Sequence, residues 1–341
     1  MIRVFEAFAG YGSQSIALRN LGIEHEVVAI SEIDKYAIKA YEAIHGPTNN
    51  LGDICKIDPK DIPQHDLFTY SFPCQDLSVA GKQAGLGEGT RSGLLYECEK
   101  IIEHCRPKYL LLENVKNLVG KRFKPQFDKW IEYLEGLGYT NYWQVLNAKN
   151  YGVPQNRERV FVISILGEHE PFEWPTPIPL DKCIADILEE QVDEKYYINK
   201  PFHLVNKGHQ AELNIKGHDC IKRVYSTDKI APTLTTMGGG NTEPKIICEQ
   251  RCDEGLRFFK DNICGTIRTI NSGGDKRVIE EGFKIRKLTP RECFRLMGMR
   301  DGDIDKIQAA GISNTQQYKM AGNSIVVNVL EGIFKNLFKG E

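Results

Sequence analysis

The sequence of 341 residues lacks the features that mark several special classes of protein. No apolar run approaches the roughly 18–20 residues that a membrane-spanning helix needs, so we expect no contact with a membrane. The first residues, MIRVFEAFAG, lack the charged, apolar and small-residue order of a signal peptide and instead predict a buried strand. With a formal net charge of only −2, the chain as a whole also lacks the basic excess of many nucleic-acid-binding proteins.

The cysteine pattern does not indicate a disulfide framework or a metal centre. The ten cysteines are spread through the chain and no export signal precedes them, so we expect reduced thiols in a cytoplasmic protein. Cys248 and Cys252 could form a zinc site together with His218 and Cys220. The two pairs lie apart in sequence and their spacing does not repeat, so we favour small, partly buried side chains and predict no metal.

Strand and helix patterns alternate over the first 166 residues. Strands are predicted at Arg3–Phe8, Glu26–Ser31, Asp66–Phe72, Lys108–Glu113, Tyr142–Asn147 and Arg159–Leu166, and helices at Ser13–Leu21, Asp34–His45, Ser92–Cys105 and Phe123–Leu137. Several of these strands are nearly continuous apolar runs, which is typical of parallel strands covered on both faces. The alternation predicts an α/β fold with a doubly wound sheet.

The composition changes at residues 171–179 (PFEWPTPIP), where four prolines in nine residues cannot continue a helix or a central strand. From there to about Phe283 the chain is richer in Gly, Thr, Asn and Lys and has only short strand patterns. Helical periodicity returns at Thr289–Met297, with Thr289 as the expected N-cap, and at Ser324–Phe338. The expected division is a first domain over residues 1–171, a smaller second domain over 172–284 and a C-terminal segment over 285–341 that returns to the first domain.

Glycines follow the first predicted strand. Gly10 and Gly12 in a strand-to-helix turn would let a ligand approach the backbone closely. A dinucleotide fingerprint would have a third glycine at position 15, where this chain has Ser15. Glu32 ends the second strand, where an acidic residue would hold ribose hydroxyls, and Asp53 is a candidate further contact. These features predict a nucleoside-containing cofactor without separating a nicotinamide dinucleotide from S-adenosylmethionine.

A cysteine follows the third predicted strand. Pro73 ends the strand, so Cys74 would stand in a loop at the carboxyl edge of the sheet, where open α/β sheets place their sites. Its thiol is nucleophilic only where the thiolate is favoured. Residues 80–90 contain four glycines and predict a mobile lid.

Charged residues mark two more strand ends. Glu113 ends the fourth strand, where a carboxyl group is costly unless it is used or well paired, although it could simply cap the next helix. Arg157 and Arg159 lie on one face at the start of the last strand, and a surface salt-bridge ladder would also account for them.

Six segments resemble, in the same order, motifs of the DNA (cytosine-5)-methyltransferases of bacteria and their phages. They are Phe8-Ala9-Gly10-Tyr11-Gly12, Phe72-Pro73-Cys74-Gln75, Glu113-Asn114-Val115, Gln155-x-Arg157-x-Arg159, Arg286-Lys287-Leu288-Thr289-Pro290-Arg291-Glu292-Cys293 and Ala321-Gly322-Asn323-Ser324-Ile325. Ser13 stands where many members have glycine. Residues 172–284 match no invariant motif. The family's target-recognition region varies there, although Thr-Leu at 233–234 or Thr-Ile at 266–267 is similar to its Thr-aliphatic pair.

The resemblance implies a Rossmann-like S-adenosylmethionine-dependent methyltransferase sheet with a second, smaller target-recognition domain. It also implies transfer of a methyl group to carbon 5 of a flipped-out cytosine in a specific duplex DNA sequence, with S-adenosylhomocysteine as the product. Cys74 would add covalently to carbon 6. Glu113 would hydrogen-bond ring nitrogen 3 and the exocyclic amine, and Arg157 and Arg159 would face the carbonyl oxygen.

Two sets of binding residues are implied by the same resemblance. The cofactor would be bound by Phe8, Ala9, Gly10, Tyr11, Gly12, Glu32, Ile33, Asp53, Ile54, Pro73, Leu94, Asn323, Ser324 and Ile325. Phe8 would stack on the adenine and Glu32 would bind the ribose. DNA would be contacted by Gln75, Ser78, Thr233, Thr235, Thr266 and Arg268.

The distribution of charge agrees with a DNA-binding second domain. Residues 195–300 carry 20 Lys and Arg against 12 Asp and Glu, a net charge of +8 that leaves −10 for the rest of the chain. Such a basic region suits contacts with phosphates. We therefore expect a cytoplasmic, DNA-associated and monomeric enzyme that acts on double-stranded DNA.

Three alternatives stay open at this point. A dinucleotide-dependent oxidoreductase would share the sheet and Glu32 but would leave Cys74, Glu113 and the two arginines unexplained. Two alternatives agree better with the motifs: the tRNA-methylating branch of the same family and a catalytically silent DNA-binding relative. The motifs also do not separate a solitary bacterial or phage methylase from the companion of a restriction endonuclease. They identify neither the recognition sequence nor the base that removes the carbon 5 proton.

Overall fold

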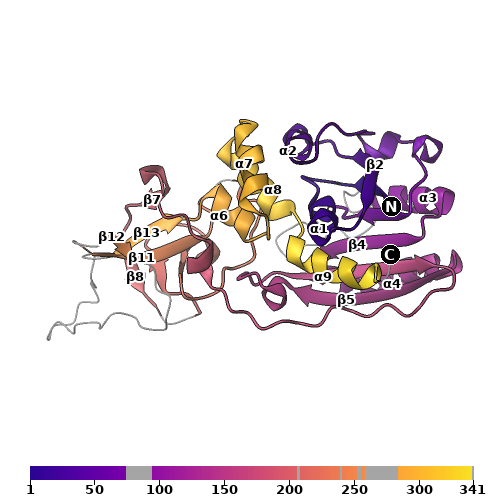
Figure 1. Ribbon diagram of the computed structural model, residues 1–341. Helices are drawn as coiled ribbons and strands as arrows, with labels where there is room; N and C mark the ends of the chain where they lie inside the picture. The colour runs from indigo at the N-terminus through magenta and orange to yellow at the C-terminus, as the bar shows by residue number, and fades with distance from the viewer. Residues whose placement is uncertain (74–93, 206–207, 239, 252–254, 258–282, 340–341) are drawn as a thin grey trace.

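A computed structural model describes residues 1–73, 94–205, 208–238, 240–251, 255–257 and 283–339. Two sheets lie at opposite ends of an elongated molecule (Figure 1). The helices α6 (Pro290–Arg295), α7 (Asp301–Ala309) and α8 (Asn314–Asn323) lie between them. None of the helices in the described ranges is long and apolar enough to cross a membrane.

The first sheet is mostly parallel. Within the described residues it has six strands in the order β2-β1-β3-β4-β6-β5. These strands are β1 (Ile2–Ala7), β2 (His25–Ser31), β3 (Leu67–Tyr70), β4 (Tyr109–Val115), β5 (Tyr139–Asn147) and β6 (Glu158–Leu166). Strands β1 to β4 run parallel, whereas β6 runs antiparallel to both β4 and β5. The reversal of β6 brings its first residues to the edge at which the parallel strands end.

The strands and helices predicted for this region are confirmed, with ends that differ by no more than three residues. The helices are α1 (Ser13–Leu21), α2 (Lys35–His45), α3 (Leu95–Cys105) and α4 (Lys124–Gly136). Asp34, expected as the first residue of a helix, is instead the N-cap of α2, and its carboxylate accepts the N–H of Tyr36 at 2.9 Å.

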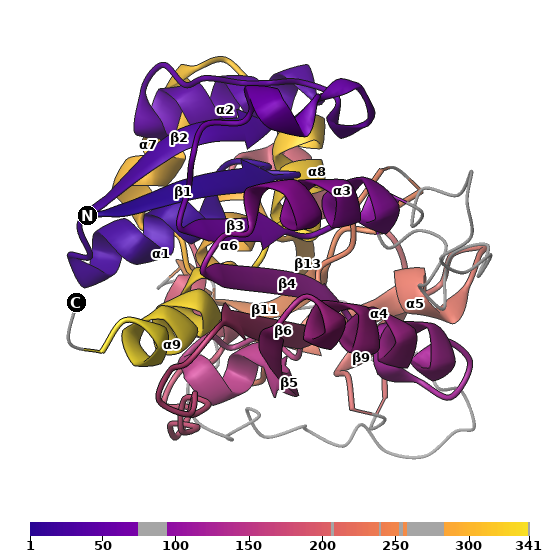
Figure 2. The same ribbon diagram turned by 90° about the vertical axis from the view of Figure 1, so that its right-hand side faces the viewer.

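Apolar side chains cover both faces of this sheet, because successive residues of a strand point to opposite sides. In β4, Tyr109 and Leu111 pack into the cluster that contains residues of α1, α2 and α9 (Val327–Leu337). Leu110 and Leu112 pack into the cluster formed with α3 and α4. Figure 2 shows α1 and α9 on one side of the sheet and α3 and α4 on the other. The predicted α/β fold is therefore confirmed.

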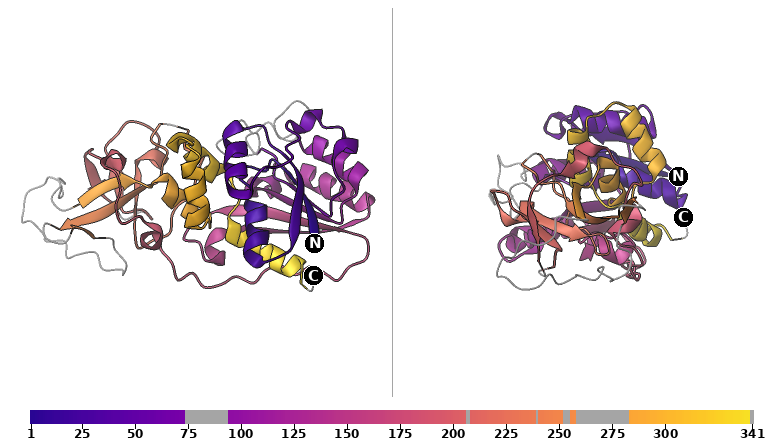
Figure 3. Two further views of the ribbon diagram at one scale, coloured as in Figure 1. Left: turned by 45° about the horizontal axis from the view of Figure 1, so that its top comes forward. Right: turned by 90° about the vertical axis from the view of Figure 1, so that its left-hand side faces the viewer.

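The second sheet is made mostly of short strands. It contains seven strands from the described residues, in the order β7-β13-β11-β10-β9-β8, with β12 paired to β11. They are β7 (Tyr197–Ile198), β8 (Phe202–Leu204), β9 (Ala211–Leu213), β10 (Arg223–Ser226), β11 (Lys245–Arg251), β12 (Gly255–Arg257) and β13 (Phe283–Lys287). Figure 3 shows this lobe apart from the first sheet. Because β13 crosses the expected boundary between residues 284 and 285, we propose that the second domain extends to Lys287.

A buried ion pair joins the second sheet to α6. Arg286 in β13 donates to the carboxylate of Glu292 at 2.7 and 2.8 Å, and both side chains are fully buried. The same carboxylate accepts the main-chain N–H of Thr289 at 2.8 Å and of Glu189 at 2.9 Å. Thr289 is the N-cap of α6, as predicted. These contacts offset the free-energy cost of burying the Glu292 carboxylate.

Candidate active site

The turn after β1 is held in left-handed backbone conformations. Phe8, Gly10 and Gly12 have φ angles of 56°, 58° and 81°. A phenylalanine rarely adopts this region, whereas glycine does so without cost. A Cβ atom on Gly12 would lie 2.5 Å from His45 Nε2 and 2.7 Å from Tyr41 Cε2, so a larger residue would collide with α2.

Glu32 fastens this turn to the start of α2. Its Oε2 accepts the N–H of Gly10 at 2.9 Å, and its Oε1 accepts the N–H groups of Ile33 and Asp34 at 2.8 Å each. The Ile33 side chain is 73% exposed beside this carboxylate. The predicted Glu32 and the glycine turn therefore meet at the carboxyl edge of the sheet, where α/β sheets bind ligands.

Other residues of the predicted cofactor set lie around the same edge. Asp53 caps the short 3₁₀ turn that follows it, and Ile54 is buried. Ile54 packs in the same apolar cluster as Phe8 and Leu94, which are partly buried. Ala9 and Ile325 are buried, Pro73 is half-buried and Asn323 is exposed.

The C-terminal motif meets the turn after β1. The Tyr11 hydroxyl donates to Ser324 Oγ at 2.7 Å, and these residues are 313 positions apart in sequence. Ser324 Oγ in turn donates to the carbonyl of Ala321 at 3.0 Å. The two ends of the predicted cofactor set are thus joined by a direct hydrogen bond.

A buried carboxyl group lies beneath the same turn, and sequence reasoning did not include it. Glu6 in β1 accepts hydrogen bonds from the Ser15 N–H at 3.1 Å, the Ser15 hydroxyl at 2.8 Å and the Tyr41 hydroxyl at 2.9 Å. Burial raises the pKa of Glu6 to about 7, although the hydrogen bonds lower it. A charged residue within an apolar strand was the signal that could have identified it.

Glu113 and Arg159 form an ion pair at the same edge. In the ladder between β4 and β6, Val115 lies opposite Arg159, because β6 starts where β4 ends. Arg159 Nε lies 3.2 Å from Glu113 Oε1, and the Glu113 residue is only 8% exposed. Burial raises the pKa of Glu113, while the charges of Arg159 and then Arg157 lower it. Burial therefore disfavours the ionised form of this carboxyl group, whereas the two arginines favour it.

Asn114 ties this pair to the cysteine motif. Its Nδ2 donates to the carbonyl of Phe72 at 3.1 Å, and its Oδ1 accepts the N–H of Val115 at 2.9 Å. Phe72 is followed by Pro73 and Cys74. Sequence reasoning did not single out Asn114 as a site residue, although a buried amide between an acid and an apolar residue was the signal.

Several predicted residues lie outside the described ranges: Cys74, Gln75, Ser78, Thr266 and Arg268, together with Cys252 of the zinc hypothesis. Within the described ranges, no group of three or more His, Cys, Asp or Glu side chains could hold a metal ion.

Arg157, which we expected to face the substrate, contacts main-chain carbonyl groups in this structure. Its guanidinium is buried and donates to the carbonyls of Leu234 at 3.0 Å, Gly322 at 2.9 Å and Ser324 at 2.8 Å. A buried guanidinium needs acceptors for its donors, and main-chain carbonyls supply them here. In this structure Arg157 positions the main chain around the site.

A loop of the second domain docks on the start of β6. Gln155, fully buried, accepts the N–H of Leu234 at 3.1 Å and donates to the carbonyl of Leu296 at 2.6 Å. The Thr233 hydroxyl donates to the carbonyl of Asn156 at 2.5 Å. The Thr235 side chain is exposed. The sequence did not predict this role of Gln155. The only signal was a long polar side chain in an otherwise apolar segment.

Gly322 brings α8 against this loop with no space for a side chain. A Cβ atom there would lie 1.9 Å from the carbonyl oxygen of Thr235. Because main chain must move to relieve the clash, Gly322→Ala should lower the free energy of unfolding by about 1–3 kcal/mol, as measured by urea denaturation. As a control, Gly302→Ala in α7, where nothing lies within 4 Å, should be neutral or stabilise by up to about 1 kcal/mol. Equal midpoints for the two variants would contradict the packing argument.

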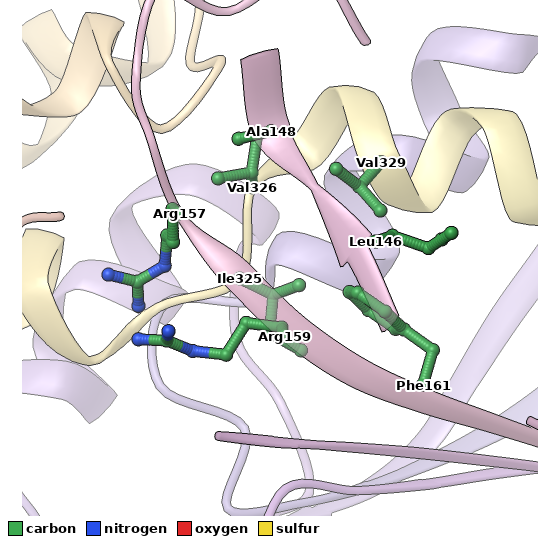
Figure 4. Close-up of a pocket in the computed structure, with 8 residues that line it drawn as sticks. All are labelled: Leu146, Ala148, Arg157, Arg159, Phe161, Ile325, Val326 and Val329. Carbon is green, nitrogen blue, oxygen red and sulfur yellow. The ribbon is translucent and has the colours of Figure 1, made fainter. Parts of the chain in front are cut away.

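A small, partly open pocket lies beside the two arginines. Its lining residues are Leu146, Ala148, Arg157, Arg159, Phe161, Ile325, Val326 and Val329. Figure 4 shows Arg157 and Arg159 extending side by side from the start of β6. The pocket thus lies between the ion pair of Glu113 and the start of α9.

Comparisons with known proteins agree on one family. The family model for the C-5 cytosine-specific DNA methylases matches residues 2–339. The type II methyltransferase M2.ScrFI of Lactococcus lactis subsp. cremoris is 41% identical over 100% of both chains. The orphan methyltransferase M.SPBetaI of Bacillus phage SPbeta is 37% identical over 98% of this chain and 97% of its own. The solved structure of the Entamoeba histolytica methyltransferase EhMeth has a TM-score of 0.72 at 18% identity, over 99% of this chain and 98% of its own, which shows a shared fold. With this match along nearly its whole length, the chain belongs to the family of C-5 cytosine-specific DNA methylases.

Proposed function

We propose that Glu113 and Arg159 are the base-binding half of an active site that methylates carbon 5 of cytosine in a specific duplex DNA sequence. The observation that carries this proposal is the 3.2 Å contact between a buried carboxyl group and a guanidinium at the carboxyl edge of the sheet. A second candidate, a nicotinamide-dependent oxidoreductase, has no use for this pair, and the family excludes it.

The residues around the turn after β1 fit S-adenosylmethionine, the methyl donor of the family. Glu32 presents a carboxylate to a ribose while the left-handed Gly10 allows close approach to the backbone. Ile33 leaves an apolar side chain uncovered beside them. When bound, the donor supplies an electrophilic methyl group on a sulfonium. We propose that Phe8 and Ile54 contact the adenine and that Asn323, Ser324 and Ile325 complete the cleft.

Catalysis begins with activation of the ring, because carbon 5 of cytosine is a poor nucleophile. The base must first leave the duplex stack, at a cost of a few kcal/mol. The Cys74 thiolate adds to carbon 6 and forms a carbon–sulfur bond. Protonated Glu113 donates to ring nitrogen 3 as negative charge enters the ring, and Arg159 orients Glu113 and faces the carbonyl oxygen.

The remaining steps restore the aromatic ring. Carbon 5 of the adduct would form a bond to the donor's methyl group as the methyl–sulfonium bond breaks, which leaves S-adenosylhomocysteine. The proton on carbon 5 is then removed by a base, for which a water is one candidate. The electron pair of the broken carbon 5–hydrogen bond re-forms the ring double bond and expels the Cys74 thiolate from carbon 6. Asn114 supports these steps by holding Phe72, two residues before the nucleophile, beside Glu113.

We propose that one chain suffices for this reaction in the cytoplasm, where the DNA of a bacterium or phage is found. Light scattering should give the mass of one chain for the enzyme alone, and the mass of one chain plus one duplex for its complex with DNA. A companion restriction endonuclease, if one is encoded, would then act on the same sequence as a separate protein. Two protein chains per duplex with a single target cytosine would contradict this proposal.

The proposed reaction is tested by mapping what the purified enzyme methylates. Bisulfite sequencing of plasmid DNA after incubation with S-adenosylmethionine should show protected cytosines at one fixed position of a recurring sequence. Transfer RNA in a parallel assay should take up no methyl group. Methylation confined to tRNA, or protection of no cytosine by a folded enzyme, would overturn the proposal.

Glu113→Gln should lower kcat by about 100- to 1,000-fold, because the amide keeps the shape of the side chain but cannot deliver a proton. In the wild type, activity that needs protonated Glu113 is lost as the pH rises through its raised pKa. The glutamine variant should lack this alkaline decline. Glu158→Gln is the matched control, because Glu158 is an exposed neighbour whose salt bridge is with Lys116. Equal pH profiles and kcat values for the two variants would remove Glu113 from the mechanism.

A further inference from the structure

We propose that the Tyr11 hydroxyl is a positioning group that couples the cofactor site to the loop at residues 233–237 of the second domain. The proposal rests on the proposed function, because it assumes a cofactor at the turn after β1 and DNA at that loop. It goes beyond that function by stating that the two ligands strengthen each other's binding through this hydroxyl.

The first observation is how Tyr11 is held. Its ring is 1% exposed and packs edge-on against Phe294 at 5.6 Å between ring centroids. Its carbonyl bonds the His45 ring at 3.1 Å, and its hydroxyl donates to Ser324 Oγ at 2.7 Å. Gly12, the next residue, has no space for a side chain on its α2 side. The turn is therefore held from α2 on one side and from the C-terminal motif on the other.

The second observation is that Ser324 continues the connection into the second domain. Its carbonyl accepts from Arg157 at 2.8 Å, and the same guanidinium donates to the carbonyl of Leu234 at 3.0 Å. A Cβ atom on Gly322 would overlap the main chain of Thr235, so the two segments are closely packed. A path of buried and partly buried hydrogen bonds, continued through Ser324 itself, thus runs from the predicted cofactor turn to the predicted DNA loop.

The third observation concerns what the hydroxyl contributes beyond packing. The ring of Tyr11 fills the apolar cluster with α1 and α9, a task that phenylalanine would perform equally well. The hydroxyl links the turn to Ser324, and Ser324 Oγ keeps its own bond to Ala321 without it. Removing the hydroxyl therefore breaks the path with little change in packing. Coupling through such a path is a free energy shared by the two ligands and is reciprocal.

The test uses the full chain and S-adenosylhomocysteine, which binds without reacting. Its Kd is measured by calorimetry alone and with a duplex that contains the mapped target sequence. In Tyr11→Phe, the Kd without DNA should rise about fivefold, as for one lost hydrogen bond. The ratio of the Kd without DNA to the Kd with DNA should fall at least about threefold. Ser324→Ala should reproduce both changes, and the double variant should add nothing further.

The matched control is Tyr139→Phe. Tyr139 is also buried, and its hydroxyl donates to the carbonyl of Pro107 at 2.7 Å, at the edge of the sheet opposite Glu113. This variant should lose similar stability but keep both Kd values. The proposal would be overturned if the two variants behaved identically, or if the ratio of the Kd without DNA to the Kd with DNA were unchanged in Tyr11→Phe. Because the ligand does not react, a wild type that binds it but methylates no DNA would refute the proposed function separately.

Discussion

Alanine in place of Cys74 is expected to abolish methyl transfer to DNA, with a loss of about 10⁴-fold or more. Without a thiolate no bond forms at carbon 6, and carbon 5 stays too weak a nucleophile to accept the methyl group. Transfer of labelled methyl to the mapped duplex measures the effect. Cys105→Ala removes a half-buried thiol at the end of α3 and should keep wild-type activity.

The same variant separates chemistry from binding. Cys74→Ala should bind the duplex and S-adenosylhomocysteine with wild-type affinity, since the thiol itself holds neither ligand. With a 5-fluorocytosine target, fluorine cannot leave carbon 5 as a cation, so the wild type should form a covalent complex that survives denaturing electrophoresis. Cys74→Ala should form none. Substantial methylation by the variant, or a covalent complex without Cys74, would exclude the proposed nucleophile.

Glu292→Ala should lower the free energy of unfolding by about 3–5 kcal/mol. The change leaves the buried guanidinium of Arg286 without its charge partner and frees the N–H groups of Thr289 and Glu189. Urea denaturation followed by circular dichroism gives the loss.

Two controls show whether burial is the cause of that loss. Glu158→Ala breaks an ion pair whose Lys116 and Glu158 side chains are 57% and 45% exposed, and it should cost less than about 1 kcal/mol. Replacing Arg286 and Glu292 together by methionine removes both charges and should recover part of the stability. A Glu292→Ala variant as stable as Glu158→Ala would refute the argument.

The first sheet could be predicted from sequence because local patterns determine it. Near-continuous apolar strands alternate with amphipathic helices, and each strand end is marked by a polar or glycine-containing turn. The reversed direction of β6 could not be predicted in this way, since an apolar strand has the same pattern in either direction. The proposed extension of the second domain to Lys287 could not be read from the sequence, because β13 is short and passes directly into the Thr289 cap.

The candidate site could be predicted in part. The motifs identified Glu113 and Arg159, which the structure brings together. Arg157 and Gln155 bind main-chain groups of Leu234, Gly322, Ser324 and Leu296. No local pattern specifies such partners, because they lie far along the chain and are main-chain atoms. The residue type at a motif position therefore does not distinguish a substrate contact from a support of the fold.

The position of α9 has a consequence for how the protein folds during synthesis. This helix covers the same face of the first sheet as α1, yet residues 327–337 follow the whole second domain in the chain. Until the ribosome has released them, the apolar side chains that α9 covers on that face stay exposed, and Arg157 lacks the carbonyl groups of Gly322 and Ser324. Contacts over such separations form slowly and leave apolar surface open to aggregation. The first domain thus becomes native only after the second has been made. Chaperone binding in that interval would raise the yield of folded protein.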